Sequence, residues 1–176
     1  MDLTGKLLVA QPTNRDKDQE GSVLFVYEQT KNFASAICVN KETDRTIAEL
    51  AAYEGYEYSG SEVLYYGGPS NPTALVMLHT PDWECDNTYQ ITDDICISSD
   101  PTMLYRICDG DKPTKWKLFM GMFTWKKGEL NEDLKTPSWI YGDATPIIVF
   151  SEDEAKQYNW AIKSCSRFMV DQYFKI

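Results

Sequence analysis

Few segments of this sequence stay apolar for more than a handful of residues before Pro, Gly, Asn or Asp interrupts them. The apolar runs are rich in β-branched and aromatic residues, which is typical of short strands. Between residues 115 and 124, large apolar side chains alternate with other residues in the two-residue period of a strand. The predicted strands are Lys6–Ala10, Ser22–Glu28, Ala34–Asn40, Glu62–Tyr66, Ala74–His79, Thr88–Ile91, Ile95–Ser98, Lys115–Trp125 and Pro146–Phe150.

Three helices are predicted from the residues at their ends, where N-capping side chains begin a helix and glycine ends it. The signals are Asp100-Pro101 with Gly110, the capping box Ser151–Glu154 before a C-terminal helix, and the pair Thr46 and Glu49 with Gly55. A further helical turn is expected after Gly128. Because strands and helices do not alternate regularly, the sequence predicts an α+β fold rather than a doubly wound sheet.

The length predicts one compact domain over residues 1–176. A chain of this size buries about 70% of its surface on folding, which supports one core and leaves little for a second. No apolar run reaches the roughly 18 residues of a membrane span. The segment before the first strand is too short and too polar for a signal peptide. We therefore expect a cytoplasmic protein without membrane contact.

The net charge of −10 disfavours direct nucleic-acid binding, because a DNA-binding protein needs a basic stripe against the phosphates. The best candidate for such a stripe is a group of lysines around two tryptophans, which can hold a single strand by stacking and charge. The lysines are Lys112, Lys115, Lys117, Lys126 and Lys127, around Trp116 and Trp125. The alternative is that they form the solvated face of a strand pair whose tryptophans pack inward.

The five cysteines indicate neither a zinc site nor a disulfide framework, because their number is odd and none form a closely spaced pair. We expect reduced structural thiols, with Cys85 the most exposed of them. The acidic loop from Asp82 to Asp93 only loosely resembles a calcium loop, since Asn87 stands where the sharp turn requires glycine. No metal and no cofactor is predicted.

The single histidine, His79, is the residue on which a nucleophile system with a histidine base would have to be built. It ends a predicted strand and can therefore face a cleft. No G-x-S-x-G motif accompanies it, and a lone histidine at a strand end is more often a hydrogen-bonded structural residue, so no catalytic residue is assigned. The glycines of Gly67-Gly68-Pro69 are not spread as in a phosphate loop, and they are expected to supply positive-φ backbone where strands change direction.

Several short motifs, in order over nearly the whole chain, together resemble the AlgH/YqgE family of bacterial proteins. They are Gly5–Pro12, Gly21–Val23, Ile37–Asn40, Tyr66–Pro69, Leu78-His79, Gly121–Trp125 and Gly128–Leu130, with Trp139 and Trp160 also placed as in the family. The resemblance implies a single α+β domain in which a branched mixed β-sheet folds into a barrel-like core with a few helices packed on it. Members are commonly labelled transcriptional regulators, and the family implies no reaction or cofactor.

The sequence also departs from the family pattern. Phe123 and Thr124 replace a small residue and a glycine in the Gly121–Trp125 motif, so Phe123 would fill any groove that these small residues line in relatives. The high content of Tyr, Asn and Asp suggests an AT-rich genome, and a phage-borne divergent copy is one explanation for these differences.

Three hypotheses about function follow. The first is a non-enzymatic regulatory protein that acts through protein–protein interaction and modulates transcription indirectly, with exposed aromatic residues as anchors. The alternative is a small-molecule-binding protein or hydrolase with a cleft near His79, and the third is a nucleic-acid-binding regulator. The candidate binding groove consists of Asn40, Gly67, Gly68, Pro69, His79 and Trp125. The oligomeric state and the identity of the protein partner are left open.

Overall fold

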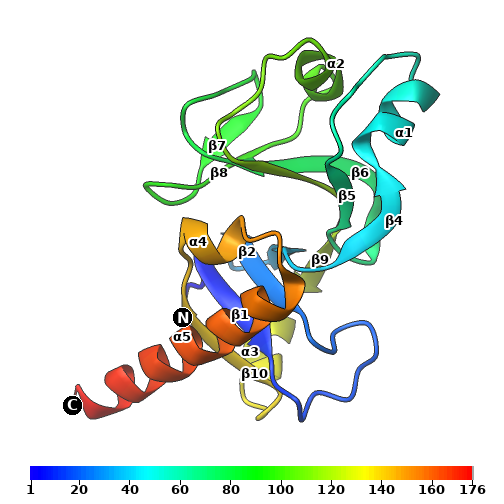
Figure 1. Cartoon of the computed structure of the whole chain (residues 1–176). Helices are drawn as coiled ribbons and strands as arrows, with labels where there is room; N and C mark the ends of the chain where they lie inside the picture. Colours follow the sequence, from blue (N-terminus) through cyan, green and yellow to red (C-terminus); the bar gives the residue numbers. More distant parts are fainter. Residues whose placement is uncertain (176) are drawn as a thin grey trace.

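The structure, a computed structural model, describes residues 1–175 and shows two lobes joined by one long strand (Figure 1). Strands and helices follow each other irregularly along the chain, which confirms the predicted α+β class. The strands are β1 (Lys6–Ala10), β2 (Val23–Gln29), β3 (Phe33–Cys38), β4 (Glu42–Thr46), β5 (Val63–Tyr66), β6 (Ser70–His79), β7 (Thr88–Gln90), β8 (Cys96–Ser98), β9 (Trp116–Lys126) and β10 (Trp139–Asp143). The helices are α1 (Ile47–Tyr53), α2 (Met103–Cys108), α3 (Glu129–Asp133), α4 (Pro146–Val149) and α5 (Glu154–Phe174).

The strands of residues 1–175 form one curled and branched sheet. Its main path runs β10-β1-β2-β3-β9-β6-β8-β7, and β4 and β5 branch from it at β9. Only the β5–β9 pairing is parallel within this part of the chain, and the others are antiparallel. The branched mixed sheet implied by the family resemblance is therefore confirmed. None of the helices within residues 1–175 is long and apolar enough to cross a membrane.

Strand β9 belongs to both lobes. Its first half lies between β5 and β6, because Met120 pairs with Tyr66 on one edge and with Leu75 on the other. Its second half pairs with β3, where Trp125 lies opposite Ala34. In Figure 1, β9 accordingly extends from the upper lobe, which holds α1 and α2, to the lower lobe, which holds β1, β2, β10 and α5.

The chain crosses β9 at a point where three glycines meet. Residues 67–69 connect β5 on one edge of β9 with β6 on the other, and they cross over the strand at Gly121. A Cβ added to Gly67 would lie 2.1 Å from the carbonyl oxygen of Gly121, and one added to Gly68 would lie 2.1 Å from the carbonyl carbon of Met122. Gly68 has φ +154°, whereas Gly67 is not among the positive-φ residues of the chain. The predicted change of strand direction is present, but Gly67 is required by close packing rather than by its φ angle.

Buried clusters lie in each lobe, and one cluster continues between them, since it joins Val9 of the lower lobe with Leu78 of the upper lobe. In the upper lobe, Met77 and Leu118 of the sheet pack against Ile47 of α1 and Met103 and Ile107 of α2. In the lower lobe the curled sheet buries aliphatic side chains on both faces, and one face is covered by α4 and α5. The buried side chains of α5 are Gln157, Ala161 and Cys165, which lie in its first twelve residues.

Local signals predicted some helix ends correctly, but the N-cap of α2 is Thr102, so the predicted start at Asp100-Pro101 was wrong. Thr46 and Glu49 form the expected capping box of α1, and Gly128 precedes α3. The N-cap of α5 is Asp153, whose side chain accepts from the backbone N–H of Lys156, so the predicted capping box that begins at Ser151 was wrong.

One predicted strand is a helix, and two strands were missed. Residues 146–149 form α4, because Thr145 caps the segment and Pro146 occupies its first turn. The missed strands are β4 and β10, both short. Strand β10 pairs with β1 from the opposite end of the chain, which no local pattern indicates.

Candidate functional site

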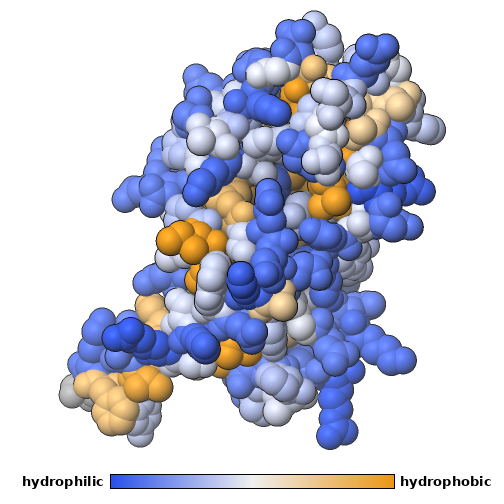
Figure 2. Space-filling model, in the orientation of Figure 1, coloured by the Kyte–Doolittle hydropathy of each residue, from blue (hydrophilic) through white to orange (hydrophobic). Residues whose placement is uncertain are grey.

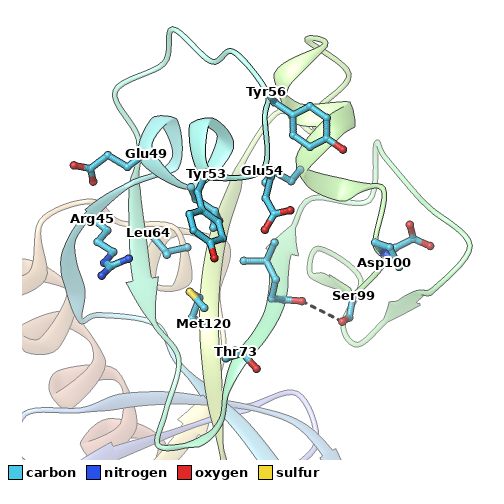
Figure 3. A pocket seen from close by; sticks show the side chains of 14 residues that line it. Arg45, Glu49, Tyr53, Glu54, Tyr56, Leu64, Thr73, Ser99, Asp100 and Met120 are labelled. Carbon is cyan, nitrogen blue, oxygen red and sulfur yellow. Dashed lines mark hydrogen bonds between the residues drawn. The ribbon is translucent and has the colours of Figure 1, made fainter.

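A cavity of about 860 Å³ opens in the upper lobe, and we call it the α1–α2 cavity. Its apolar floor is formed by Leu50 and Leu64 on one side, Leu75 and Met120 of the sheet below, and Leu104 of α2. This volume lies within the range of cavities that hold small ligands or a few inserted side chains. Figure 3 shows the side chains that line this cavity.

The rim of the α1–α2 cavity carries charge and aromatic rings. Figure 3 shows Tyr53 and Glu54 directed toward the space between α1 and β6, with Arg45 and Asp100 at opposite ends of the opening. With Glu49, three carboxylates surround the opening against one guanidinium. The rim is therefore net negative around an apolar floor, an arrangement that favours a ligand with apolar groups next to positive charge.

Local structure fixes both sides of this opening. On one side, the capping box of Thr46 and Glu49 holds the first turn of α1. On the other, Asp100 accepts from the backbone N–H and the hydroxyl of Thr102, and these bonds lower the pKa of the Asp100 carboxyl. Ser99 donates to the carbonyl of Leu75 at 3.1 Å (Figure 3). Three side chains of the lining, Glu49, Ser99 and Asp100, are therefore held by hydrogen bonds to the backbone.

His79 lies inside the upper lobe with both ring nitrogens bonded. Nδ1 lies 2.8 Å from the carbonyl oxygen of Thr80, and Nε2 lies 2.7 Å from the hydroxyl oxygen of Ser98. The carbonyl can only accept, so Nδ1 carries the proton and Nε2 accepts from Ser98. Burial lowers the pKa of His79, and the indole of Trp83 packs edge-on against its ring at 5.2 Å.

This histidine and serine have the contact of a base with a nucleophile, but they are closed to substrate. Ser98 is 1% exposed and His79 is fully buried. The Ser98 hydroxyl also lies 2.6 Å from that of Thr88, which continues the network toward Cys85. His79 lines neither the α1–α2 cavity nor any of three further cavities within residues 1–175. The hydrogen bonds of His79, Ser98 and Thr88 link β6, β8 and β7 to one another. They leave neither the imidazole nor the Ser98 hydroxyl accessible to a substrate.

The six residues of the predicted groove do not meet in one place. Asn40 is buried near Gly67, where its side chain accepts from the backbone of Val23 and donates to Gly21. Gly68 and the exposed Pro69 follow in the connection over β9.

The other two groove residues lie at opposite ends of β9. His79 pairs with Trp116, at one end of the strand, whereas Trp125 lies nine residues further along. That separation is about 30 Å at the rise of a strand. The indole of Trp125 donates to Asp133 at 2.9 Å and stacks on Phe123, and both rings are buried.

The lysines predicted as a basic patch are also separated. Lys112 approaches Glu62 at 4.0 Å in the upper lobe, and Lys126 lies at the far end of β9. Trp125 packs inward, as the solvated-face alternative predicted. Lys117 contradicts both predictions for this group, because its side chain is buried.

The Lys117 ammonium joins the two lobes. It donates to the carbonyl of Val39 at 3.0 Å and to that of Ser151 at 2.6 Å, and it lies 4.3 Å from the centre of the Tyr65 ring. Burial lowers the pKa of Lys117 to about 8, against the opposing effect of nearby carboxylates such as Glu152. Sequence reasoning missed this role because a lysine on an alternating strand predicts an exposed face.

Potential metal-ligating side chains are scattered over the part of the chain that the structure describes. No three His, Cys, Asp or Glu side chains come together as metal ligands within residues 1–175. All five cysteines are free thiols, and Cys85 and Cys108 are the two that are not fully buried.

The architecture described above, a curled α+β sheet with two lobes, defines a known structural class. The chain superposes on the solution structure of the AlgH protein from Pseudomonas aeruginosa with a TM-score of 0.78 at 21% identity, over 93% of this chain and 88% of the other. Protein DIP2367 from Corynebacterium diphtheriae gives a TM-score of 0.77 at 18% identity, over 93% and 87%. At these identities the likeness shows the shared fold.

The sequence places the chain within that class. The AlgH-like family model (DUF179) matches residues 7–168, and the chain belongs to this family. A UPF0301 protein of Bartonella tribocorum is 27% identical over 179 residues, which covers 96% of this chain and 91% of the relative. A UPF0301 protein of Ruegeria pomeroyi is 29% identical over 170 residues, covering 93% and 91%. The family resemblance inferred from the motifs is thus confirmed.

Proposed function

We propose that this protein is a non-enzymatic regulator that binds a protein partner through the α1–α2 cavity. The observation that carries the proposal is the cavity itself, with an apolar floor, a net negative rim and two tyrosines, Tyr53 and Tyr56, at its edge. Buried apolar anchors surrounded by a polar rim are the usual composition of a protein interface. Any effect on transcription would then be indirect, through the bound protein.

The chemistry of the rim favours one class of partner. A segment with one or two large apolar side chains beside Lys or Arg would fill the floor and oppose Glu54 and Asp100. A segment with carboxylates in the same places would meet like charge. The cavity lining contains no histidine, cysteine or lysine. A substrate there would therefore meet no imidazole base, no thiol nucleophile and no amine that could form an imine with a carbonyl.

A peptide panel tests the proposal. Fluorescein-labelled peptides with two apolar residues flanked by lysines should raise the anisotropy on addition of the protein, and peptides with glutamates in place of the lysines should not. The variant Y53K/E54K should weaken binding about tenfold or more, because it removes an aromatic wall and reverses a rim charge. Tyr53 and Glu54 are exposed, so the fold is expected to persist.

A matched control keeps the charge change but moves it away from the cavity. In Y89K/E20K, an exposed tyrosine and an exposed glutamate elsewhere are replaced in the same way, and binding should stay within twofold of the wild type. Equal binding of the lysine and glutamate peptides, or equal loss in both double variants, would contradict the proposal. Melting temperatures of all three proteins confirm that they are folded.

A further inference from the structure

The last turns of α5 extend away from the body of the protein (Figure 1). Val170, Tyr173 and Phe174 are 53%, 72% and 77% exposed, and Figure 2 shows apolar surface at this projecting end. The rings of Tyr173 and Phe174 pack edge-to-face with their centres 5.3 Å apart, which makes one apolar tip of two aromatic side chains. An exposed aromatic tip of this kind is typical of an interface anchor.

Helix α5 also carries an excess of cations in an acidic protein. Lys163, Arg167, Val170 and Phe174 are spaced by four, three and four residues, so cations and apolar side chains share one face of the helix. From Glu154 to Lys175 the segment carries four cations and two carboxylates, while the whole chain has a net charge of −10. The helix end therefore combines apolar side chains with an excess of cations, the two properties proposed for the partner of the α1–α2 cavity, with Asp171 as the one carboxylate near the tip.

The helix end cannot occupy the cavity of its own chain, because the two lie at opposite ends of the molecule (Figure 1). We propose that the end of α5 inserts Tyr173 and Phe174 into the α1–α2 cavity of a second copy. In this contact, Lys163 and Arg167 lie toward the acidic rim that includes Glu54. This inference rests on the proposed function of the cavity, and it names the partner segment as the protein's own C-terminal helix.

The geometry of this contact is head to tail. The surface offered by one copy differs from the surface offered by the next, so the contact repeats and builds rings or open chains rather than a two-fold dimer. In a helix-in-groove contact, the helix inserts apolar side chains that are three and four residues apart. Val170, Tyr173 and Phe174 at the α5 tip have this spacing.

Complementation between two variants tests the head-to-tail contact. Y173D/F174D removes the apolar tip and keeps the cavity, whereas Y53K/E54K alters the cavity and keeps the tip. In sedimentation velocity, the wild type should form larger species as its concentration rises, and each variant alone should remain monomeric. An equimolar mixture of the two variants should form a 1:1 dimer and nothing larger, since only one intact tip and one intact cavity are available in each pair.

Three outcomes would overturn the inference. The first is a wild type that stays monomeric at every concentration, and the second is a Y53K/E54K variant that associates as well as the wild type, which would show packing of α5 on α5. The third is a mixture of the variants that stays monomeric. All four substituted side chains are exposed, and circular dichroism verifies that both variants are folded. The control Y89K/E20K should associate like the wild type.

A peptide distinguishes failure of this contact from failure of the cavity. A labelled peptide with the sequence of Lys163–Lys175 should bind the wild type, and Y53K/E54K should bind it about tenfold more weakly or worse. If the apolar-basic panel binds but this peptide does not, the proposed function stands and the self-contact is wrong. If neither binds, both fail.

Discussion

The carbonyl oxygen of Gly68 lies so close to the α-carbon of Gly121 that a Cβ on Gly121 would be only 2.2 Å from it. This contact is where the connection between β5 and β6 crosses β9. Gly121 also has φ +78°, in the left-handed region that side chains disfavour. Two independent constraints thus fall on one residue at the junction between the lobes.

Replacement of Gly121 by alanine should therefore destabilise the fold more than the left-handed φ angle alone would predict. We expect Gly121→Ala to lower the free energy of unfolding by at least about 3 kcal/mol, because strain and a backbone collision add. Gly110 has a similar φ of +84° with open space around it, so Gly110→Ala should cost only about 1 to 2 kcal/mol. Urea denaturation of both variants measures the difference, and equal losses would show that the crossing is not tightly packed.

The single imidazole of the protein gives an unambiguous titration. The folded pKa of His79 is lowered by burial, below the value of about 6.5 in an unfolded chain. As the pH falls below 6.5 the unfolded state binds a proton first, so His79 contributes stability that is lost as the pH falls through its folded pKa. Two-dimensional NMR of the ring should give a midpoint below 6.5 in the folded protein and about 6.5 in urea. A folded midpoint at or above 6.5 would mean that the Ser98 and Thr80 contacts do not enclose the ring.

The buried ammonium of Lys117 should appear as a rise in stability at alkaline pH. The pKa of Lys117 is about 8 in the folded state and 10.5 in a free side chain, so between these values the unfolded state holds more protons. Relative to Lys117→Met, the wild type should gain about 2 kcal/mol in unfolding free energy from pH 8 to pH 10. The comparison uses urea melts at each pH. Lys115→Met, at an exposed position two residues earlier, should run parallel to the wild type.

The five thiols should react with a thiol reagent at rates that follow their accessibility to solvent. Burial raises the pKa of Cys38, Cys96 and Cys108, and that of Cys165 to about 12, so these side chains hold little thiolate at pH 8. With dithiobis(nitrobenzoate) at pH 8, we expect one fast-reacting thiol per chain, and Cys85→Ser should remove that fast phase. Full reaction of all five should require denaturant. Persistence of the fast phase in the serine variant would assign it to Cys108, the other partly exposed thiol.

The sequence predicted those features that depend on neighbouring residues. The Thr46 and Glu49 capping box and the early strands follow from local chemistry, and the structure has them. Strand β10 was missed because its pairing partner β1 is more than a hundred residues away. The segment after Thr145 was predicted as a strand from its β-branched residues, although Thr145 and Pro146 are also a helix start.

The candidate site could be predicted less well than the fold. The α1–α2 cavity lies between two short helices about fifty residues apart, and its floor also includes residues of β5, β6 and β9. No periodicity within one element indicates such a space. The burial of Lys117 could not be predicted either. Its partners are the backbone carbonyls of Val39 and Ser151, and every residue has a carbonyl, so no residue type in the sequence indicates this contact.

The sharing of β9 also determines how the molecule can be divided. A cut anywhere along this strand would leave each fragment with a sheet edge that has lost its partner, and unprotected edges recruit strands from other molecules. Neither half is therefore expected to persist as an autonomous unit after proteolysis or gene fission. We therefore expect the two lobes to fold, unfold and evolve together as one unit.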